Sequence, residues 1–330
     1  MKSVLRTLVV VVGVMSVGFA FAESRTDPKA EPKSGSVRSI NVLTGDTNGV
    51  YHPLGVALSK IYARALPQLN VSVRPTQGST ENLNLLQASR AEVAFTLGDS
   101  LHDAWKGDEG AGFKVPLKKL RAIAGMYPNY IQIVARDGAG IKTLADLKGK
   151  RVSVGALRSG TELNARAIFR AAGLSYQDFA RVDYLPFSES VELMKRRQLD
   201  VTLQSTGLGA ASLRDLARAM KVIVIAIPAE VVDKVKVNDP AYQHGVIPAR
   251  TYEGQTAGVP TATVTNFLVT HENVPTDVVY TMTKSMFENL EQLTKAHSAA
   301  KEIKREKAPI VPIPLHPGAE RYYREAGLIK

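Results

Sequence analysis

Along most of its 330 residues, this chain alternates short apolar segments with longer amphipathic ones. The apolar segments, such as 39–43, 71–74 and 93–97, have the length and composition of strands. The segments between them have the apolar spacing of helices. Repeated strand-turn-helix units pack as a sheet with helices on its faces. The alternation therefore predicts an α/β fold.

The units form two successive sets, which predicts two lobes. One lobe is expected to consist of residues 37–130 and 264–330, and the other of residues 131–263. Two extended segments, Tyr130–Arg136 and Val264–Thr270, are the candidate hinge strands that join the lobes. Ligands of such sheets bind beyond the carboxyl ends of the strands, so two facing lobes predict one ligand cleft between them.

Two further predictions concern local structure. The stretch 239–259 contains several glycines and prolines and is predicted to be a return loop. Residues 277–297 are predicted to form a single long helix.

The beginning of the chain predicts export. A basic start, an apolar run and a small-residue site that ends at Ala22 form the layout of a secretory signal peptide over residues 1–22, with cleavage after Ala22 and a periplasmic product. Residues 23–36 are polar and are predicted to be a disordered leader. The sequence contains no cysteine, which argues against a lipid anchor at the cleavage site, disulfides and thiolate metal ligands.

The formal net charge of +11 is spread along the chain, and its densest cluster is Lys195–Arg197 on a predicted helix. A nucleic-acid binder would concentrate basic residues and interleave them with aromatic ones. The charge therefore indicates a general attraction for anions and no nucleic-acid partner.

Three turns, at residues 44–52, 76–82 and 155–162, share one chemistry. Each follows a strand, contains glycine with hydroxyl or amide side chains, and precedes a helix. Free N–H groups at helix starts bind carboxylate or phosphate, and glycine lets a ligand approach the backbone. The alternative is that these residues only cap their helices, and Ser159 with Glu162 does fit a capping box. Because the three turns come from both predicted lobes, we predict a shared anion site.

Two charged residues extend this prediction. The guanidinium of Arg158 could bind a carboxylate through two parallel hydrogen bonds, or Arg158 could be an ordinary surface residue. Asp99, after a predicted strand, could accept from an ammonium group or cap the next helix. The candidate ligand-binding residues are Asn48, Gly49, Tyr51, His52, Ser79, Thr80, Asn82, Asp99, Arg158, Ser159, Gly160, Thr161 and Gly207.

The same turns carry a resemblance. Thr44-Gly45 followed by Gly49-Val50-Tyr51-His52-Pro53-Leu54-Gly55 is similar to the TGG…GTYYPLG opening of the TAXI family, the extracytoplasmic binding proteins of TRAP transporters. Gly78-Ser79-Thr80-Glu81-Asn82 is similar to the family's GSVxN turn, and the tail 312–323 is the most specific match. The similarity covers nearly all of the chain after the signal peptide.

The resemblance implies a type II-like, two-lobed periplasmic binding protein with two hinge strands and an interdomain cleft. It implies that the protein captures a small carboxylate, such as glutamate, a related amino acid or a dicarboxylate, and delivers it to integral membrane TRAP permease subunits. The ligand-lining positions that it implies are Tyr51, Ser79, Asn82, Asp99, Ser159 and Thr161.

The chain departs from the family pattern in the ligand-facing loops, so the identity of the solute cannot be copied from relatives. The departures are Val50, His52, Leu97, Arg158 and the Thr206–Gly209 segment, which lacks the usual double glycine. We expect Arg158 to favour a second acidic group on the solute.

Other functional classes have less support in the sequence. It contains no nucleophile elbow, P-loop or H-E-x-x-H helix, and no base is placed to activate Ser159. We predict no enzymatic activity, no cofactor and no metal. The alternative to transport is a sensor that presents its ligand to a membrane histidine kinase. The predicted partners are a small anionic solute and the permease, with the protein itself a monomer that is not inserted in the membrane.

Overall fold

The computed structural model describes residues 38–330 of the chain. The predicted signal peptide (1–22) and the predicted leader (23–36) lie outside the described residues. Within the part of the chain that is described, no helix is both long and apolar enough to cross a membrane.

Ten strands of the described chain form one mixed sheet. Its order is β2-β1-β3-β10-β4-β7-β5-β6, while β8 pairs with β4 and β9 pairs with β10. The strands are β1 (Ser39–Leu43), β2 (Asn70–Arg74), β3 (Val93–Leu97), β4 (Leu120–Arg136), β5 (Arg151–Ser153), β6 (Arg181–Asp183), β7 (Val201–Thr206), β8 (Val222–Ile225), β9 (Tyr242–Ile247) and β10 (Val259–His271).

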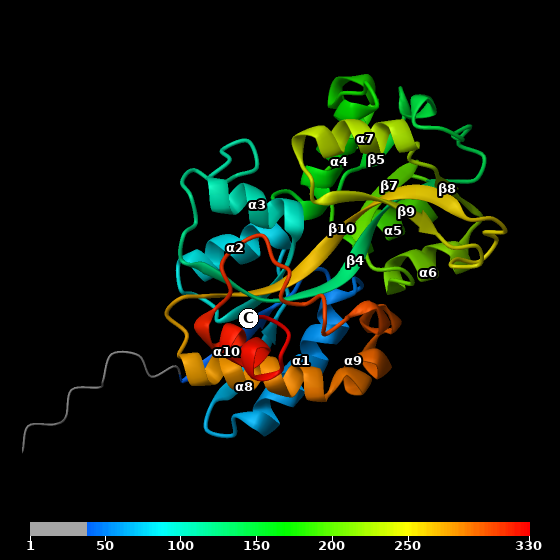
Figure 1. Cartoon of the computed structure of the whole chain (residues 1–330). Coiled ribbons are helices and arrows are strands. Elements are labelled where there is room, and N and C mark those ends of the chain that lie inside the picture. Colours follow the sequence, from blue (N-terminus) through cyan, green and yellow to red (C-terminus); the bar gives the residue numbers. More distant parts are fainter. Residues whose placement is uncertain (1–37) are drawn as a thin grey trace, which may run out of the picture. The chain divides into compact units, whose positions relative to one another are not determined.

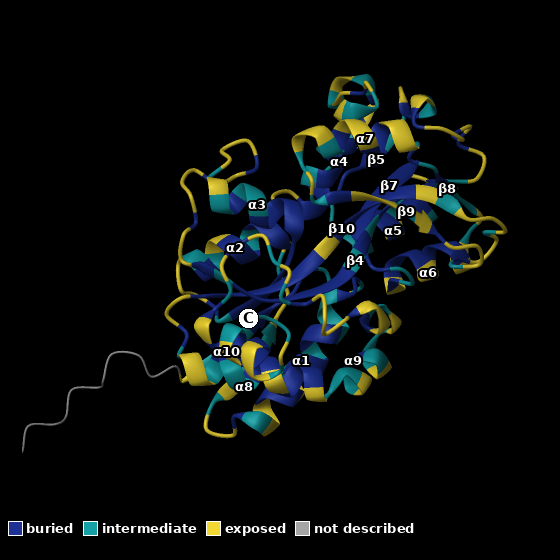
Figure 2. Cartoon of the chain, viewed as in Figure 1, coloured by how far each residue is buried: buried dark blue, intermediate teal, exposed yellow. Residues whose placement is uncertain are grey.

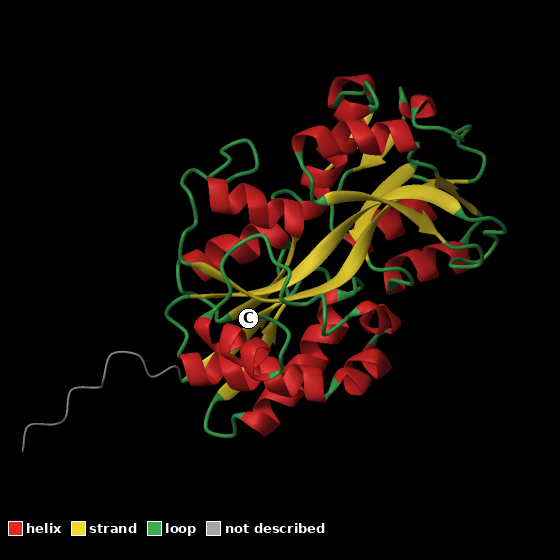
Figure 3. Ribbon diagram, in the orientation of Figure 1, coloured by secondary structure: helices red, strands yellow, loops and turns green. Residues whose placement is uncertain are grey.

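The helices flank this sheet (Figure 3). They are α1 (Tyr51–Ala65), α2 (Ser79–Gln87), α3 (Gly98–Lys106), α4 (Gly160–Ala171), α5 (Phe187–Lys195), α6 (Ala211–Ala219), α7 (Ala229–Asn238), α8 (Thr276–Glu288), α9 (Leu290–Ala296) and α10 (Pro317–Glu325). Short 3₁₀ helices lie at η1 (Ala145–Leu147), η2 (Tyr176–Asp178) and η3 (Ser298–Glu302).

Two sets of parallel strands are separated by two long antiparallel ones. β1 pairs in parallel with β2 and β3, and β5 pairs in parallel with β6 and β7. Parallel neighbours need crossover connections, which α1 and α2 supply in the first set and α4 and α5 in the second. β4 and β10 pair antiparallel with each other and run between the two sets (Figure 1). The predicted hinge segments, 130–136 and 264–270, lie within these two strands.

The buried side chains fall into four hydrophobic clusters. Two clusters draw their residues from 40–127 and 267–323, with Ala210 as the exception. The other two draw theirs from 131–264, with Leu97 as the exception. The strands are mostly buried, and the helices turn a buried face to them and an exposed face outward (Figure 2). The division into lobes at the boundaries given above stays a prediction.

The single long helix predicted over 277–297 is wrong. The chain forms α8 and α9 there, because Asn289 adopts φ −124° and ψ 29°, outside the helical region. Its side chain donates to the Ser285 carbonyl at 2.8 Å, a local hydrogen bond of the kind that competes with helix continuation.

The return loop predicted over 239–259 is also partly wrong, because it contains β9, which pairs antiparallel with Val259–Val264 of β10. Gly245 lies within β9, where a Cβ atom would be 2.4 Å from Thr263 Cγ2. The close approach of the two strands therefore requires glycine, the residue that makes this segment resemble a loop in the sequence.

Candidate functional site

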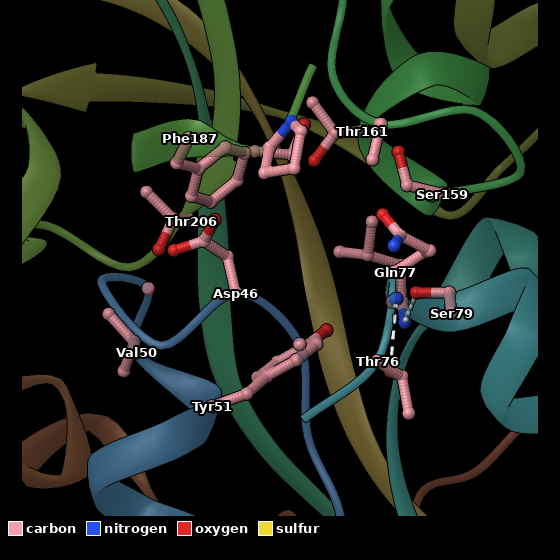
Figure 4. A pocket seen from close by; sticks show the side chains of 18 of the residues that line it. Asp46, Val50, Tyr51, Thr76, Gln77, Ser79, Ser159, Thr161, Phe187 and Thr206 are labelled. Carbon is pink, nitrogen blue, oxygen red and sulfur yellow. Dashed lines mark hydrogen bonds between the residues drawn. The ribbon is translucent and has the colours of Figure 1, made fainter. Parts of the chain in front are cut away.

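A cavity of about 250 Å³ lies where the first turns of several helices meet (Figure 4). Its volume is below the roughly 300–1,000 Å³ of drug-sized pockets, which suits a small solute. The lining residues are Gly45, Asp46, Gly49, Val50, Tyr51, Pro75, Thr76, Gln77, Gly78, Ser79, Leu97, Asn129, Ala156, Ser159, Gly160, Thr161, Pro186, Phe187, Ser205 and Thr206.

Four helices begin at this cavity. α1 and α2 come from the stretch 37–130, and α4 and α5 come from the stretch 131–263. The residues before α1, α2 and α5 make no side-chain cap hydrogen bond. Only α4 is capped, since Ser159 Oγ accepts from the Glu162 backbone N–H at 3.1 Å. Unsatisfied N–H groups and the helix dipole make each of these ends attractive to an anion.

Ser79, the first residue of α2, and Ser159, the N-cap residue of α4, lie close together. A Cβ atom at Gly160 would be 2.7 Å from Ser79 Oγ, and one at Gly78 would be 3.6 Å from Ser159 Cβ. Ser79 Oγ accepts from the Leu97 backbone N–H at 3.0 Å, which holds the start of α2 against the end of β3. Glycine at 160 therefore permits the two helix starts to approach each other, as glycine does wherever backbone passes close to its neighbours.

A chain of hydrogen bonds runs beneath the cavity from α1 to β7. The Tyr51 hydroxyl donates to Asn266 Oδ1, and Asn266 Nδ2 donates to Asn129 Oδ1 at 2.8 Å. Asn129 Nδ2 donates to the Ser205 carbonyl at 3.1 Å. Burial raises the pKa of Tyr51 well above its usual value, so its phenol stays a neutral hydrogen-bond donor.

The chain continues from Ser205 to a buried acid. Ser205 Oγ donates to Asn164 Oδ1 at 2.6 Å, and Asn164 Nδ2 donates to Asp99 Oδ2. The Tyr242 hydroxyl also donates to Asp99 Oδ2, at 2.9 Å. Burial, with Asp239 nearby, raises the pKa of Asp99 to about 7.

The lining of the cavity contains almost no charged side chains. Among its lining residues, all within the described part of the chain, none is Lys, Arg or His, and Asp46 alone carries a charged side chain. An anion bound in this cavity would therefore be held by helix N-termini and hydroxyl groups rather than by a cationic side chain.

Six of the predicted site residues line the cavity, and seven do not. Those that line it are Gly49, Tyr51, Ser79, Ser159, Gly160 and Thr161. Those outside its lining are Asn48, His52, Thr80, Asn82, Asp99, Arg158 and Gly207.

Several of the residues outside the lining support the residues that form it. Asn82 Nδ2 donates to the carbonyls of Thr44 and Phe95 at 2.7 and 2.8 Å, which joins the first turn to β3. The Asn48 carbonyl accepts from the Ser212 N–H of α6 at 3.2 Å. Gly207 packs against Val50, where a Cβ would be 3.1 Å from Cγ2.

The remaining four lie around the site without a lining contact. Arg158 is exposed, with a left-handed φ of 59°. His52 Nδ1 and Thr80 Oγ1 are buried and without a hydrogen-bond partner among the described residues. Asp99 reaches the cavity only through Asn164 and Ser205.

Sequence reasoning missed Phe187, Asn129 and Ser205 as candidates. Pro186–Phe187 begins α5 without a glycine or hydroxyl residue, so it lacks the chemistry shared by the other turns. Asn129 and Ser205 lie inside β4 and β7. Position gives a signal for two of them, because Ser205 lies next to the carboxyl end of β7 and Phe187 begins α5, whereas Asn129 lies in the middle of β4 and has no such signal. No group of three or more His, Cys, Asp or Glu within residues 38–330 is arranged to hold a metal ion.

Comparison with known proteins gives a family and a fold. The model of the NMT1-like family matches residues 42–327. The solved structure of MatC from Rhodopseudomonas palustris with bound malate is 13% identical, with a TM-score of 0.57 over 88% of this chain and 97% of that one. The periplasmic binding protein BugD is 12% identical, with a TM-score of 0.56 over 88% and 98% of the two chains. A structure described as a periplasmic transporter is 12% identical, with a TM-score of 0.54 over 88% and 92%.

These identities show the fold alone. The chain has the α/β fold of the two-lobed periplasmic binding proteins, so the predicted fold class is confirmed. The resemblance to the TAXI family in particular stays a prediction.

Proposed function

This chain belongs to the NMT1-like family, and from that premise we propose that it is the periplasmic solute-binding component of a TRAP transporter of the TAXI type. It captures a small carboxylate and delivers it to the membrane permease. It carries out no reaction on that solute.

The observation that carries this proposal is the meeting of four helix starts at one small cavity. A carboxylate placed there accepts hydrogen bonds from the N–H groups in the first turns of α1 and α2, which have no side-chain cap, and from the hydroxyls of Ser79 and Thr161. Hydrogen bonds to a charged group contribute about 1.5–3 kcal/mol each, so a handful supports micromolar affinity, about −8 kcal/mol. MatC, which has the same fold, binds malate, which is a small carboxylate of the kind proposed here.

Binding is proposed to work by population shift. Open and closed arrangements of the two lobes interconvert about β4 and β10, and the solute favours the closed one because both lobes contact it only there. The closed protein then presents a combined surface of both lobes to the permease.

The test is calorimetric titration of the purified protein with a panel of amino acids, 2-oxo acids and dicarboxylates. At least one should bind, and its methyl ester or amide, which lacks the negative charge, should bind at least about tenfold more weakly. At 100 times its dissociation constant the bound solute should raise the free energy of unfolding by about 2.7 kcal/mol. Equal affinity for acid and ester would contradict the proposed carboxylate site.

A further inference from the structure

Asp46 is the cavity residue that the proposed carboxylate site does not explain. It lies in the turn between β1 and α1, and its side chain points into the cavity beside Phe187 and Thr206 (Figure 4). The TGG pattern quoted above has glycine at this place, so the resemblance assigns Asp46 no role.

The carboxylate of Asp46 is incompletely satisfied. Asp46 Oδ1 accepts from the Asn48 backbone N–H at 2.8 Å. Asp46 Oδ2 lies 3.4 Å from Ser188 Oγ and 3.5 Å from Ser188 N, at the long limit of hydrogen bonding. No described Lys, Arg or His forms an ion pair with it. One of its oxygens therefore still has room for a strong donor on the cavity side.

The surroundings of Asp46 strengthen the electrostatic interaction between its carboxylate and a charged group of a bound solute. The Phe187 ring packs over the same turn, with Cε2 3.5 Å from the Cβ position of Gly49. An apolar ring beside a half-buried carboxylate excludes water, and charges interact more strongly where water is excluded. A solute with only negative charges would meet this carboxylate as a like charge, whereas a protonated amine would neutralise it.

We propose that Asp46 binds a protonated amine of the solute, so that this cavity selects ammonium carboxylates, such as α-amino acids, over 2-oxo acids and amine-free dicarboxylates. The solute's carboxylate is held by the helix starts, and its ammonium group is held by Asp46. This inference rests on the proposed function and specifies the solute class for the same cavity.

The test compares ligands that differ only in the amine. The pairs are alanine with pyruvate, leucine with 4-methyl-2-oxopentanoate, and glutamate with 2-oxoglutarate, together with 1,4-diaminobutane as an amine that has no carboxylate. Wild type should bind the amino acid of at least one pair at least about thirtyfold more tightly than its 2-oxo partner. Asp46→Asn keeps the shape and the acceptor for Asn48, and it should reduce that preference at least about tenfold by weakening the amino acid alone.

Two control variants separate the alternatives. Asp137→Asn removes an exposed charge elsewhere and should keep the preference. Ser188→Ala should also keep it. If Ser188→Ala removes the preference as fully as Asp46→Asn does, Asp46 acts only by contacting α5 and the inference is overturned.

The outcomes also distinguish this inference from the function on which it rests. Tight binding of 2-oxo acids or dicarboxylates, unaffected by Asp46→Asn, would leave the carboxylate site standing and overturn the amine site. Binding of 1,4-diaminobutane without any amino acid, lost in Asp46→Asn, would overturn the carboxylate site and support the amine site. Failure of every probe to bind would overturn both.

Discussion

Two polar regions are each lined by residues from both stretches of chain, 37–130 and 131–263. They differ in whether their polar groups have hydrogen-bond partners within the protein. The cavity leaves the first turns of α1 and α2 without a side-chain cap, and the first turn of α5 has the Asp46 carboxylate at 3.5 Å from Ser188 N. Asp46 itself has no ion pair among the described residues. The second region, which we call the acidic hollow, lies between α3, α4 and α7 and is lined by Asp99, Asp103, Asp108, Arg166, Lys234, Asp239 and Tyr242, among others. There the buried Asp99 accepts from Asn164, Tyr242 and the Ser100 backbone N–H.

The two regions differ in the source of their hydrogen-bond partners. A buried polar group is costly unless it is paired, so Asp99 is paired by side chains of the protein itself. The cavity groups need no internal partner if a solute supplies one. Ser205 and Asn164 connect the two regions, so a change in one should be felt weakly in the other.

The largest loss of solute binding should come from a side chain that fills the space between the helix starts. In Gly160→Val, a Cβ would lie 2.6 Å from Leu97 Cδ1, 2.7 Å from Ser79 Oγ and 2.9 Å from Ser100 Oγ. We expect solute affinity, measured by calorimetry, to fall at least about a hundredfold because the helix starts cannot approach.

The control is Ala219→Val, which places the same valine side chain at the exposed end of α6 and should leave affinity unchanged. Melting temperatures of both variants show whether Gly160→Val remains folded. Affinity within threefold of wild type in a folded Gly160→Val would show that the close approach is not needed for binding.

The acidic hollow should make the stability of the protein depend on pH through Asp99. The pKa of Asp99 is about 7 in the folded protein against an ordinary 3.8, because burial disfavours its charged form. The folded protein therefore holds this proton more tightly than the unfolded chain, and the contribution of Asp99 to the free energy of unfolding should fall as pH rises from about 4 to 7. Asp99→Asn lacks this contribution, so the difference in free energy of unfolding between wild type and Asp99→Asn should fall over this range. Asp103, whose pKa burial also raises to about 7, and the histidines whose pKa values burial lowers are present in both proteins and cancel in that difference.

The measurement is urea unfolding of wild type and Asp99→Asn at intervals across that range. Asp137→Asn, which changes an exposed acid outside the hollow, should show the wild-type pH dependence. An identical pH dependence in Asp99→Asn and wild type would mean that Asp99 does not hold its proton in the folded protein.

How far the sequence predicts these two regions depends on which residues carry the signal. Turns with glycine and a hydroxyl or amide side chain between a strand and a helix predicted Gly49, Ser79 and Ser159 as ligand-binding residues, because the chain order alone brings such turns to one edge of a sheet. Phe187 was missed, since a proline-aromatic helix start has no shared motif. The sequence also did not predict that Asp46 faces the cavity while Asp99 is hydrogen-bonded within the protein.

Each aspartate follows a strand and precedes or begins a helix, so local pattern treats the two alike. What separates them is long-range packing. Asp99 meets Asn164 and Tyr242, which are 65 and 143 residues away along the chain, whereas Asp46 faces a cavity. Contacts over such separations depend on how β9 and α4 pack. The sequence did not predict β9, because Gly245 makes that segment resemble a loop.

The smallest expected effect concerns Arg158, the residue that the sequence favoured as a partner for a second acidic group. Its side chain is exposed and outside the cavity lining, although it directly precedes Ser159, which lines the cavity. Arg158→Ala should therefore change the affinity for dicarboxylates and amino acids less than about twofold in calorimetry at physiological salt, where exposed charges are screened. A tenfold loss confined to dicarboxylates would mean that the loop before α4 turns inward when solute binds, and that Arg158 adds a cation to a cavity that otherwise relies on helix starts. An unchanged affinity would leave Asp46 as the one charged side chain through which this cavity distinguishes its solutes.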